Sequence, residues 1–283
     1  MKLWSPKGGV NKQIEEFTVG NDYLIDRALV KYDAVASKVH ARMLGKIGIL
    51  SDNEVTKLTD ELDTIIQLAE DDSFEIQPEQ EDCHTAIEEH LTAKLGDLGK
   101  KIHTARSRND QVLAALRLYY KDQLDAMASL AQEFIRSVSA FTVEHGDVEF
   151  PGYTHTRKAM PASVNMWGSA FVQSMQDNFT LIRSAKQLTD QSPLGTGAGY
   201  GVPLDVDREF TSEELGFDRV QQSPIYVQNS RGKFEAHILH VCSQVMLDLN
   251  RLATDLIFFS MPGIGYFDLP DEFCTGSSIM PQK

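Results

Sequence analysis

Apolar residues recur at three- to five-residue steps along most of the chain, which is the spacing of one face of an α-helix. The first such run begins at Asn21 and ends near Gly48. The run Ser51-Asp52-Asn53-Glu54 forms a capping box that predicts the start of the next helix. Asp82 is expected to cap a further helix that fades at Gly96. The first half of the chain is therefore predicted to be helical.

Three longer apolar-periodic runs follow, over residues 110–146, 161–193 and 234–259. At 1.5 Å per residue the first would extend about 50 Å, which is typical of an elongated helical bundle. No alternating strand pattern competes with these helices. We therefore predict an all-α fold, with a smaller N-terminal helical domain over residues 1–109 and a central long-helix bundle over residues 110–283. Apolar residues lie on several helix faces, which indicates an oligomer.

Composition and charge narrow the class of protein. The 283 residues are 42% hydrophobic and 24% charged, an ordinary globular composition. The formal net charge of -14 argues against nucleic acid or an anionic membrane as partner. Charged residues interrupt the third long run, so no membrane span is expected, and the first residues lack a signal-peptide pattern. Three scattered cysteines indicate reduced thiols, and we predict a cytoplasmic protein.

The first chemical cluster runs from His103 to Gln111 (HTARSRNDQ), at the start of the first long helix. A helix N-terminus offers unsatisfied N–H groups and the positive end of the helix dipole, which both favour carboxylates. The two arginines add planar anion recognition. The alternative is a solvated, charged helix start in which Asn109 is the N-cap.

The second cluster runs from Pro151 to Lys158 (PGYTHTRK) and places His155 in a turn before the second long helix. A turn histidine between hydroxyl groups suits acid–base work, because its unperturbed pKa lies near 6.5. An ordinary surface histidine is the alternative interpretation. The neighbouring pair Arg157-Lys158 is compatible with simple solvation.

A glycine-rich segment lies at Gly195–Gly201 (GTGAGYG). No strand is expected before it and no Gly-Lys-Ser/Thr follows, so the pattern does not predict a phosphate-binding loop. We reject nucleotide binding and expect a tight, mobile loop between bundle helices.

The last cluster is Gly276-Ser277-Ser278, followed by Lys283. Ser277 lacks the Gly-x-Ser-x-Gly context of an acyl-transfer nucleophile. A serine that accepts a proton would need backbone N–H groups and a cation such as Lys283 to lower its pKa. A plain Ser/Gly turn is the alternative.

The histidines do not show metal-ligand spacing. His84 and Glu88 lie four residues apart on a predicted helix, a spacing at which two side chains can pair, while His40 and His90 add no ligand pattern. We therefore predict no metal site.

Taken together, the clusters resemble a known family. The segments 103–111, 151–155 and 276–283 occur in the order seen in argininosuccinate lyases, which belong to the fumarase/aspartase superfamily. Glu81–His84 and Asp207–Thr211 also look like that family, and the resemblance spans nearly the whole chain. The first chemical cluster separates this chain from adenylosuccinate lyases, which lack the Arg-Ser-Arg-Asn-Asp run.

The resemblance implies an all-α, three-domain subunit of the fumarase/aspartase type that assembles as a homotetramer with active sites shared between subunits. It implies that argininosuccinate is cleaved to arginine and fumarate by a cofactor-independent β-elimination, as in arginine biosynthesis. His155 and Ser277 match the acid–base positions, and we favour Ser277 as the base on a mobile loop. The matching substrate positions are Arg108, Asn109, Thr154 and Lys283, together with Asp22 at a position where serine is common.

Several positions depart from the family pattern. Ala105 stands where glycine is usual, Arg157 replaces glutamine, and the N-terminal Trp-Gly-Gly motif is rewritten at residues 4–9. The family signature continues past Lys283, so we expect a fragment or truncated form that has little activity alone. Two alternatives remain, a non-catalytic structural homologue like those among lens crystallins, and a superfamily lyase that acts on another succinyl substrate.

Overall fold

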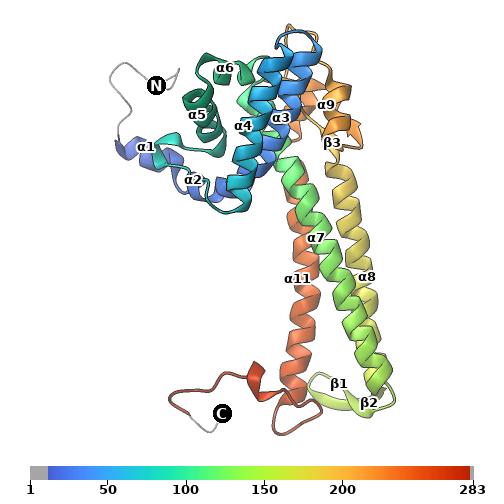
Figure 1. Ribbon diagram of the computed structural model, residues 1–283. Coiled ribbons are helices and arrows are strands. Elements are labelled where there is room, and N and C mark those ends of the chain that lie inside the picture. Colours follow the sequence, from blue (N-terminus) through green and yellow to red (C-terminus); the bar gives the residue numbers. More distant parts are fainter. Residues whose placement is uncertain (1–11, 281–283) are drawn as a thin grey trace. The chain divides into compact units, whose positions relative to one another are not determined.

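The computed structural model describes residues 12–280, which divide into two compact units. The first unit contains residues up to 123 and residues 186–234, and the second contains residues 124–185 and those from 235 onward. Three long helices, labelled in Figure 1, begin in one unit and end in the other. They are α7 (Arg108–His145), α8 (Val164–Thr189) and α11 (Lys233–Ser260).

The first unit is a cluster of short and medium helices around one apolar core. Its largest contact is the packing of α3 on α4, and fully buried residues such as Leu44, Leu58 and Leu91 fill the interior. The elements are α1 (Lys12–Val19), α2 (Asp22–Ile25), η1 (Asp26–Leu29), α3 (Val30–Lys46), α4 (Asp52–Glu70), η2 (Pro78–Gln80), α5 (Cys83–Leu95), α6 (Asp97–Lys100), η3 (Lys101–His103), α9 (Arg208–Glu214), α10 (Pro224–Asn229) and the parallel pair β3 (Gln191–Ser192) and β4 (Arg219–Val220).

Local sequence signals explain where these helices begin. The capping box predicted at Ser51 is confirmed, because its N–H donates to Glu54 Oε2 at 2.9 Å and its hydroxyl accepts the N–H of Glu54. The cap predicted at Asp82 is also confirmed, since its Oδ1 accepts the backbone N–H of Thr85 at 2.7 Å. Each helix thus starts with a side-chain acceptor for one of the N–H groups that lack a partner within the helix.

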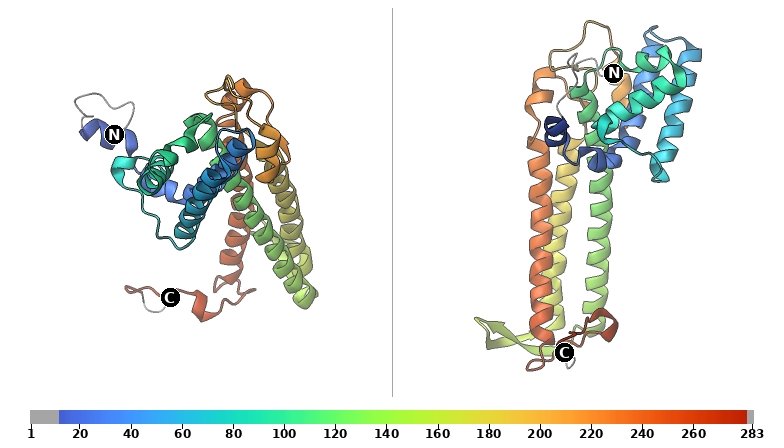
Figure 2. Two further views of the ribbon diagram at one scale, coloured as in Figure 1. Left: turned by 45° about the horizontal axis from the view of Figure 1, so that its top comes forward. Right: turned by 90° about the vertical axis from the view of Figure 1, so that its left-hand side faces the viewer.

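In the second unit the long helices lie side by side, as the two views in Figure 2 show. Small and medium residues such as Ala128 of α7, Ile182 of α8 and Val241 of α11 are buried between them. An aromatic cluster that includes Phe150, Trp167 and Phe259 closes one end of the three helices. A short turn of helix, η4 (Asp271–Phe273), precedes the last described residues.

One part of the helical prediction was wrong. Residues 149–163 form an antiparallel hairpin of β1 (Glu149–Thr154) and β2 (Arg157–Ser163), and α8 begins at Val164 rather than at Pro161. The strands show no apolar alternation because most of their side chains are exposed, so the period of two was hidden. Ser163 Oγ accepts the backbone N–H of Met166 at 3.2 Å and so starts the helix.

The all-α prediction is confirmed, since helices dominate both units and the two strand pairs are short. The predicted domain boundary at residue 109 stays a prediction, because the two compact units are divided at residue 123 and share the long helices. Over residues 12–280 we find no helix with both the length and the apolar character needed to cross a bilayer.

Candidate functional site

The first candidate cluster lies at the N-terminus of α7. Ser107 immediately precedes this helix, and its hydroxyl accepts the backbone N–H of Asn109 at 3.2 Å. The alternative of Asn109 as the N-cap is therefore wrong, because Asn109 already lies in the first turn. Its side-chain amide donates to Ser107 Oγ at 3.1 Å, which leaves Arg108 and Asn109 together at the positive end of the helix dipole.

Arg108 is oriented by α5. Its guanidinium donates to Asp82 Oδ1 at 2.9 Å and to Thr85 Oγ1 at 3.2 Å. The side chain is still 37% exposed, so it retains donors that face solvent. Sequence reasoning found Asp82 as a helix cap and missed this contact, for which the neighbouring family-like segment Glu81–His84 was the available signal.

A buried polar network surrounds the start of α7. Gln111 donates to both carboxylate oxygens of Asp33, at 3.1 and 3.0 Å, and His84 Nδ1 lies 3.0 Å from Asp33 Oδ2. Arg106 donates to Ser37 Oγ at 2.7 Å. Burial acts to raise the pKa of Asp33, but its neighbours His84 and Arg106 outweigh burial and hold the pKa below its usual value. His84 therefore lies against Asp33.

Asp22 is exposed at the first position of α2. It belongs to the same unit as Arg108 and lies close enough to Asp26 to affect that carboxyl group. Burial, followed by the negative charges of Asp82 and Asp22, raises the pKa of Asp26. The first unit thus carries both the carboxylates of Asp22 and Asp82 and the guanidinium of Arg108.

The second candidate cluster is the tip of the β1–β2 hairpin, in the second unit. Thr154 pairs with Arg157, so His155 and Thr156 form a two-residue turn. Both have positive φ, 51° and 63°, which matches the twist of a tight hairpin but is unusual for residues other than glycine. The turn predicted for His155 is confirmed, and the imidazole is exposed at its tip.

The third cluster, around Ser277, also belongs to the second unit. Ser277 is half-buried, and its Oγ accepts the backbone N–H of Met280 at 3.0 Å. One backbone donor thus already faces this oxygen, as a proton-accepting serine would need. Lys283, the expected cation, lies outside the described residues.

The structure groups the predicted residues into separate sets. Arg108 and Asn109 are adjacent on α7 in the first unit, and Thr154 and His155 are adjacent on the hairpin in the second. Among the described residues, no hydrogen bond or ion pair joins His155 to Ser277. Each motif is therefore formed by residues that are close together in the sequence.

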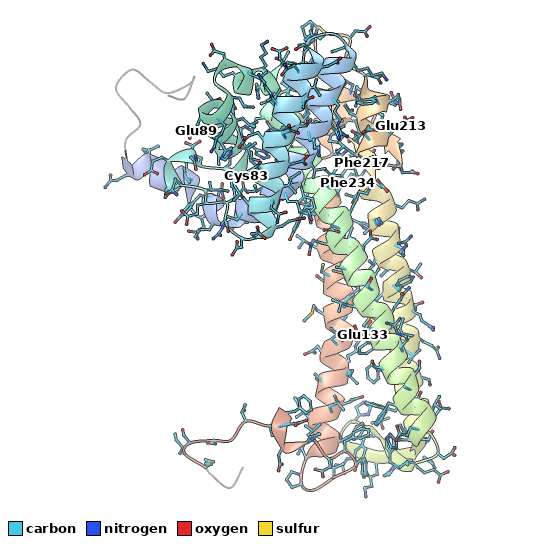
Figure 3. All side chains as sticks on the ribbon, viewed as in Figure 1. Cys83, Glu89, Glu133, Glu213, Phe217 and Phe234 are labelled. Carbon is cyan, nitrogen blue, oxygen red and sulfur yellow. The ribbon has the colours of Figure 1, made fainter. Side chains whose placement is uncertain are left out.

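One group of side chains has the chemistry of metal ligands. A carboxylate oxygen of Asp26, the Sγ of Cys83 and a ring nitrogen of His84 lie within 4.8 Å of one another, and Figure 3 shows Cys83 on α5. Asp26 Oδ2, however, accepts the backbone N–H of Cys83 at 3.3 Å, and His84 contacts Asp33. Burial raises the pKa of the Cys83 thiol, which opposes formation of the thiolate that a metal requires. We propose no metal site there.

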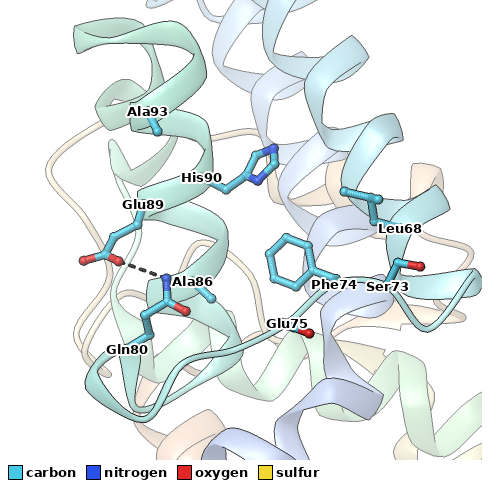
Figure 4. A pocket seen from close by; sticks show the side chains of 9 residues that line it. All are labelled: Leu68, Ser73, Phe74, Glu75, Gln80, Ala86, Glu89, His90 and Ala93. Carbon is cyan, nitrogen blue, oxygen red and sulfur yellow. Dashed lines mark hydrogen bonds between the residues drawn. The ribbon is translucent and has the colours of Figure 1, made fainter.

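A shallow pocket of about 410 Å³ lies between the loop after α4 and helix α5 (Figure 4). Phe74 and His90 line it, and Gln80 donates to Glu89 across its rim at 3.0 Å. His90 Nε2 lies 2.7 Å from Glu61 Oε1. None of the predicted site residues lines this pocket, so it is separate from the three clusters.

Comparison with known proteins gives consistent matches. A family profile described as Lyase matches residues 8–283. The chain is 55% identical over 282 residues to an argininosuccinate lyase of Thermotoga neapolitana, covering 100% of this chain and 71% of that protein. It is 43% identical to an argininosuccinate lyase of Xanthomonas oryzae pv. oryzae, covering 99% of this chain and 65% of that protein.

Solved structures agree on the fold. A structure described as an EDDS lyase variant with bound fumarate matches with a TM-score of 0.84 and 26% identity, over 95% of this chain and 53% of that one. A fumarate lyase:delta crystallin from Brucella melitensis matches with a TM-score of 0.77 at 20% identity, over 92% of this chain and 62% of that one, which concerns the fold alone. The chain thus spans part of the length of every relative named here.

Proposed function

This chain belongs to the argininosuccinate lyases of the lyase family, and from that premise we propose that the protein cleaves argininosuccinate to arginine and fumarate in arginine biosynthesis. The observation that carries the proposal is the pair Arg108-Asn109 at the positive end of α7, with the guanidinium held in place by Asp82. Fixed donors at a helix start suit a substrate that carries several carboxylates. The proposed reaction requires no cofactor.

The chemistry is a β-elimination. A base removes a proton from the succinyl carbon, the electron pair forms the carbon–carbon double bond of fumarate, and the bond to the guanidino nitrogen breaks. The electron pair of that bond stays on the nitrogen, an acid protonates the nitrogen, and arginine leaves. Negative charge develops on the neighbouring carboxylate during the first step, and fixed donors such as Arg108 and Asn109 stabilise it.

We assign the base to Ser277. Its oxygen already accepts the N–H of Met280, and the following residues Ser278 and Ile279 are exposed. An exposed segment of this kind has room to close over substrate and exclude water. Lys283 supplies the nearby positive charge in this proposal.

We assign the supporting acid–base role to His155, which the strained turn presents at an exposed tip. Two consecutive residues with positive φ cost about 1–3 kcal/mol each, and such strain occurs where a side chain must be aimed. Thr154, the last residue of β1, is proposed to contact substrate beside it. We propose that Asp22 contacts the cationic end of the substrate.

We propose a homotetramer with shared active sites as the working form. Exposed large apolar side chains on the long helices of the second unit support it, because a monomer would leave them in water. Their exposed fractions exceed 60%, and they include Leu130, Val143, Met166, Leu239, Met246 and Ile257. A second copy of this chain presents matching surfaces. The proposed partners are this second copy and the small-molecule substrate, with no nucleic acid or membrane.

The remaining proposals concern organisation and location. We propose the division into a helical domain over residues 1–109 and a bundle domain from residue 110. We also propose a cytoplasmic location, since Cys83, Cys242 and Cys274 are free thiols that fit a reducing compartment.

The proposal is tested by adding argininosuccinate to the full-length protein and following fumarate by its ultraviolet absorbance. We expect turnover in the wild type and a loss of about 10²–10⁴-fold in kcat for Ser277→Ala. The neighbouring Ser278→Ala is the matched control and should keep activity near that of the wild type. Full turnover of Ser277→Ala would remove the assignment of the base, and no fumarate from the wild type would refute the function.

A different succinyl substrate is the second candidate, because the matched fold also occurs in a protein described as an EDDS lyase. In that case other N-succinyl amines would release fumarate while argininosuccinate would not. A folded tetramer that binds argininosuccinate without turnover would instead indicate a non-catalytic homologue.

A further inference from the structure

The glycine-rich loop after β3 is organised around one buried carboxylate. Oδ2 of Asp110 accepts the backbone N–H groups of Gly195 at 3.0 Å and Gly197 at 2.9 Å. Its other oxygen, Oδ1, accepts the backbone N–H of Ser107 at 2.9 Å. Asp110 has no exposed surface, and it lies in the first turn of α7 beside Asn109.

The glycines are required by this arrangement. Gly195 and Gly197 have positive φ, +81° and +56°, and a Cβ at Gly195 would lie 2.8 Å from Cγ of Arg208. Arg208 holds the opposite side of the loop, because its Nε donates to the carbonyl oxygen of Leu194 at 2.8 Å. The loop is therefore held on its N–H side by Asp110 and on its carbonyl side by Arg208.

Successive backbone N–H groups in such a loop form a concavity that binds anions. Here the anion is supplied by the chain itself, since Asp110 takes the N–H groups that a phosphate would otherwise contact. The N–H groups of Gly195 and Gly197 are therefore occupied by Asp110.

We propose that Asp110 is a positioning residue for the substrate-binding pair Arg108-Asn109, which it holds in register with the glycine loop. This inference rests on the proposed function. The carboxylate of Asp110 accepts three backbone N–H groups, one before α7 and two in the glycine-rich loop. Asp110 and Gly195 are 85 residues apart in the sequence. Asp110 touches no substrate itself and acts through the first turn of α7.

Two opposing effects act on the pKa of Asp110. Burial raises the pKa of Asp110, while the N–H groups of Ser107 and Gly197 and the charge of Arg106 act in the opposite direction. An amide at this position has the same shape but turns its NH₂ group toward one of these N–H donors. A buried donor left without an acceptor destabilises the contact between the loop and the helix start.

The test compares Asp110→Asn with Asp248→Asn in the full-length protein. Asp248 is the control, because its carboxylate also accepts three hydrogen bonds, here from the side chains of Ser174, Asn178 and Arg251. We expect KM for argininosuccinate to rise by about tenfold in Asp110→Asn, which corresponds to roughly 1.4 kcal/mol. A purely structural role would lower the amount of active protein and leave KM unchanged, and that result would overturn the proposal.

Hydrogen exchange provides an arm that does not depend on activity. In Asp110→Asn we expect faster amide exchange both at Ser107 and at Gly195 and Gly197, and no such change in Asp248→Asn. If the wild type releases no fumarate, the proposed function fails while this arm still decides the coupling. Unchanged exchange in either of the two segments would overturn the inference whatever the activity.

Discussion

Arg108 and Asp82 form an ion pair in which Nη1 of the arginine lies 2.9 Å from Oδ1 of the aspartate. The same oxygen accepts the backbone N–H of Thr85 and caps α5. One carboxylate therefore starts a helix and aims the guanidinium that we propose binds substrate. The two roles can be separated, because one concerns stability and the other concerns substrate affinity.

Asp82→Ala is expected to lower the free energy of unfolding by about 1 kcal/mol through loss of the cap. It should also raise KM for argininosuccinate, because Arg108 loses its charged partner. Asp207→Ala is the matched control, since Asp207 caps α9 through the N–H of Phe210 and pairs with Lys46. The control should lose similar stability without a change in KM. Equal KM values in the two variants would contradict the role given to Asp82.

Ala105 has a φ of 59°, in the region that glycine occupies without strain. Ala105→Gly should relieve about 1–2 kcal/mol of strain and give back about 0.4–1 kcal/mol through the freer unfolded chain. We expect a net gain in the free energy of unfolding, measured by denaturant titration. Ala93→Gly, at an exposed position within α5, should instead lose about 1 kcal/mol. A loss in Ala105→Gly as large as that in Ala93→Gly would refute the strain.

His40 is buried and lies with its Nε2 2.8 Å from the carbonyl oxygen of Thr104. Burial, aided by the charge of Arg106, lowers the pKa of His40 to about 3. The unfolded chain takes up the proton near pH 6.5 while the folded chain does not. This residue's contribution to stability is therefore complete above pH 6.5 and falls as the pH drops toward 3, by about 1.4 kcal/mol per pH unit.

The prediction is measured as the difference in unfolding free energy between wild type and His40→Gln. This difference should shrink steadily between pH 6.5 and pH 4. A difference for His40→Gln that stays constant with pH would show that the residue titrates normally in the folded protein.

Leu239 on α11 is 67% exposed and belongs to the apolar surface of the second unit. We expect Leu239→Glu to weaken assembly of the full-length protein, because a carboxylate would be buried between copies of the chain. Sedimentation should show smaller species, with a loss of activity that parallels dissociation. Gln187→Glu, at an exposed position of α8, is the control and should remain assembled. An intact assembly of Leu239→Glu would remove this surface from the interface.

Much of the fold follows from periodicity alone. The long helices were predicted because apolar residues keep one helical face over many turns, and the caps at Ser51 and Asp82 were predicted because capping depends on residues three apart. The hairpin at residues 149–163 was missed, since its exposed strands carry no apolar alternation. Its turn was nevertheless expected around His155.

The site was predictable only in its parts. Each motif is local, so Arg108, His155 and Ser277 could be proposed as site residues from short segments and their family order. The contacts that hold them are not local, as the pairs Asp82–Arg108 and Asp110–Gly195 join residues 26 and 85 positions apart. No sequence pattern specifies such distances, because the packing of the whole unit brings these residues together.

We propose above that the full-length protein forms fumarate from argininosuccinate without a cofactor. The purified protein, after dialysis against a chelator and without added cofactors, is incubated with argininosuccinate, and both products are quantified by nuclear magnetic resonance. We expect arginine and fumarate in equal amounts at an undiminished rate. An assembled protein that forms neither product, or forms them only when a metal ion or cofactor is restored, would contradict it.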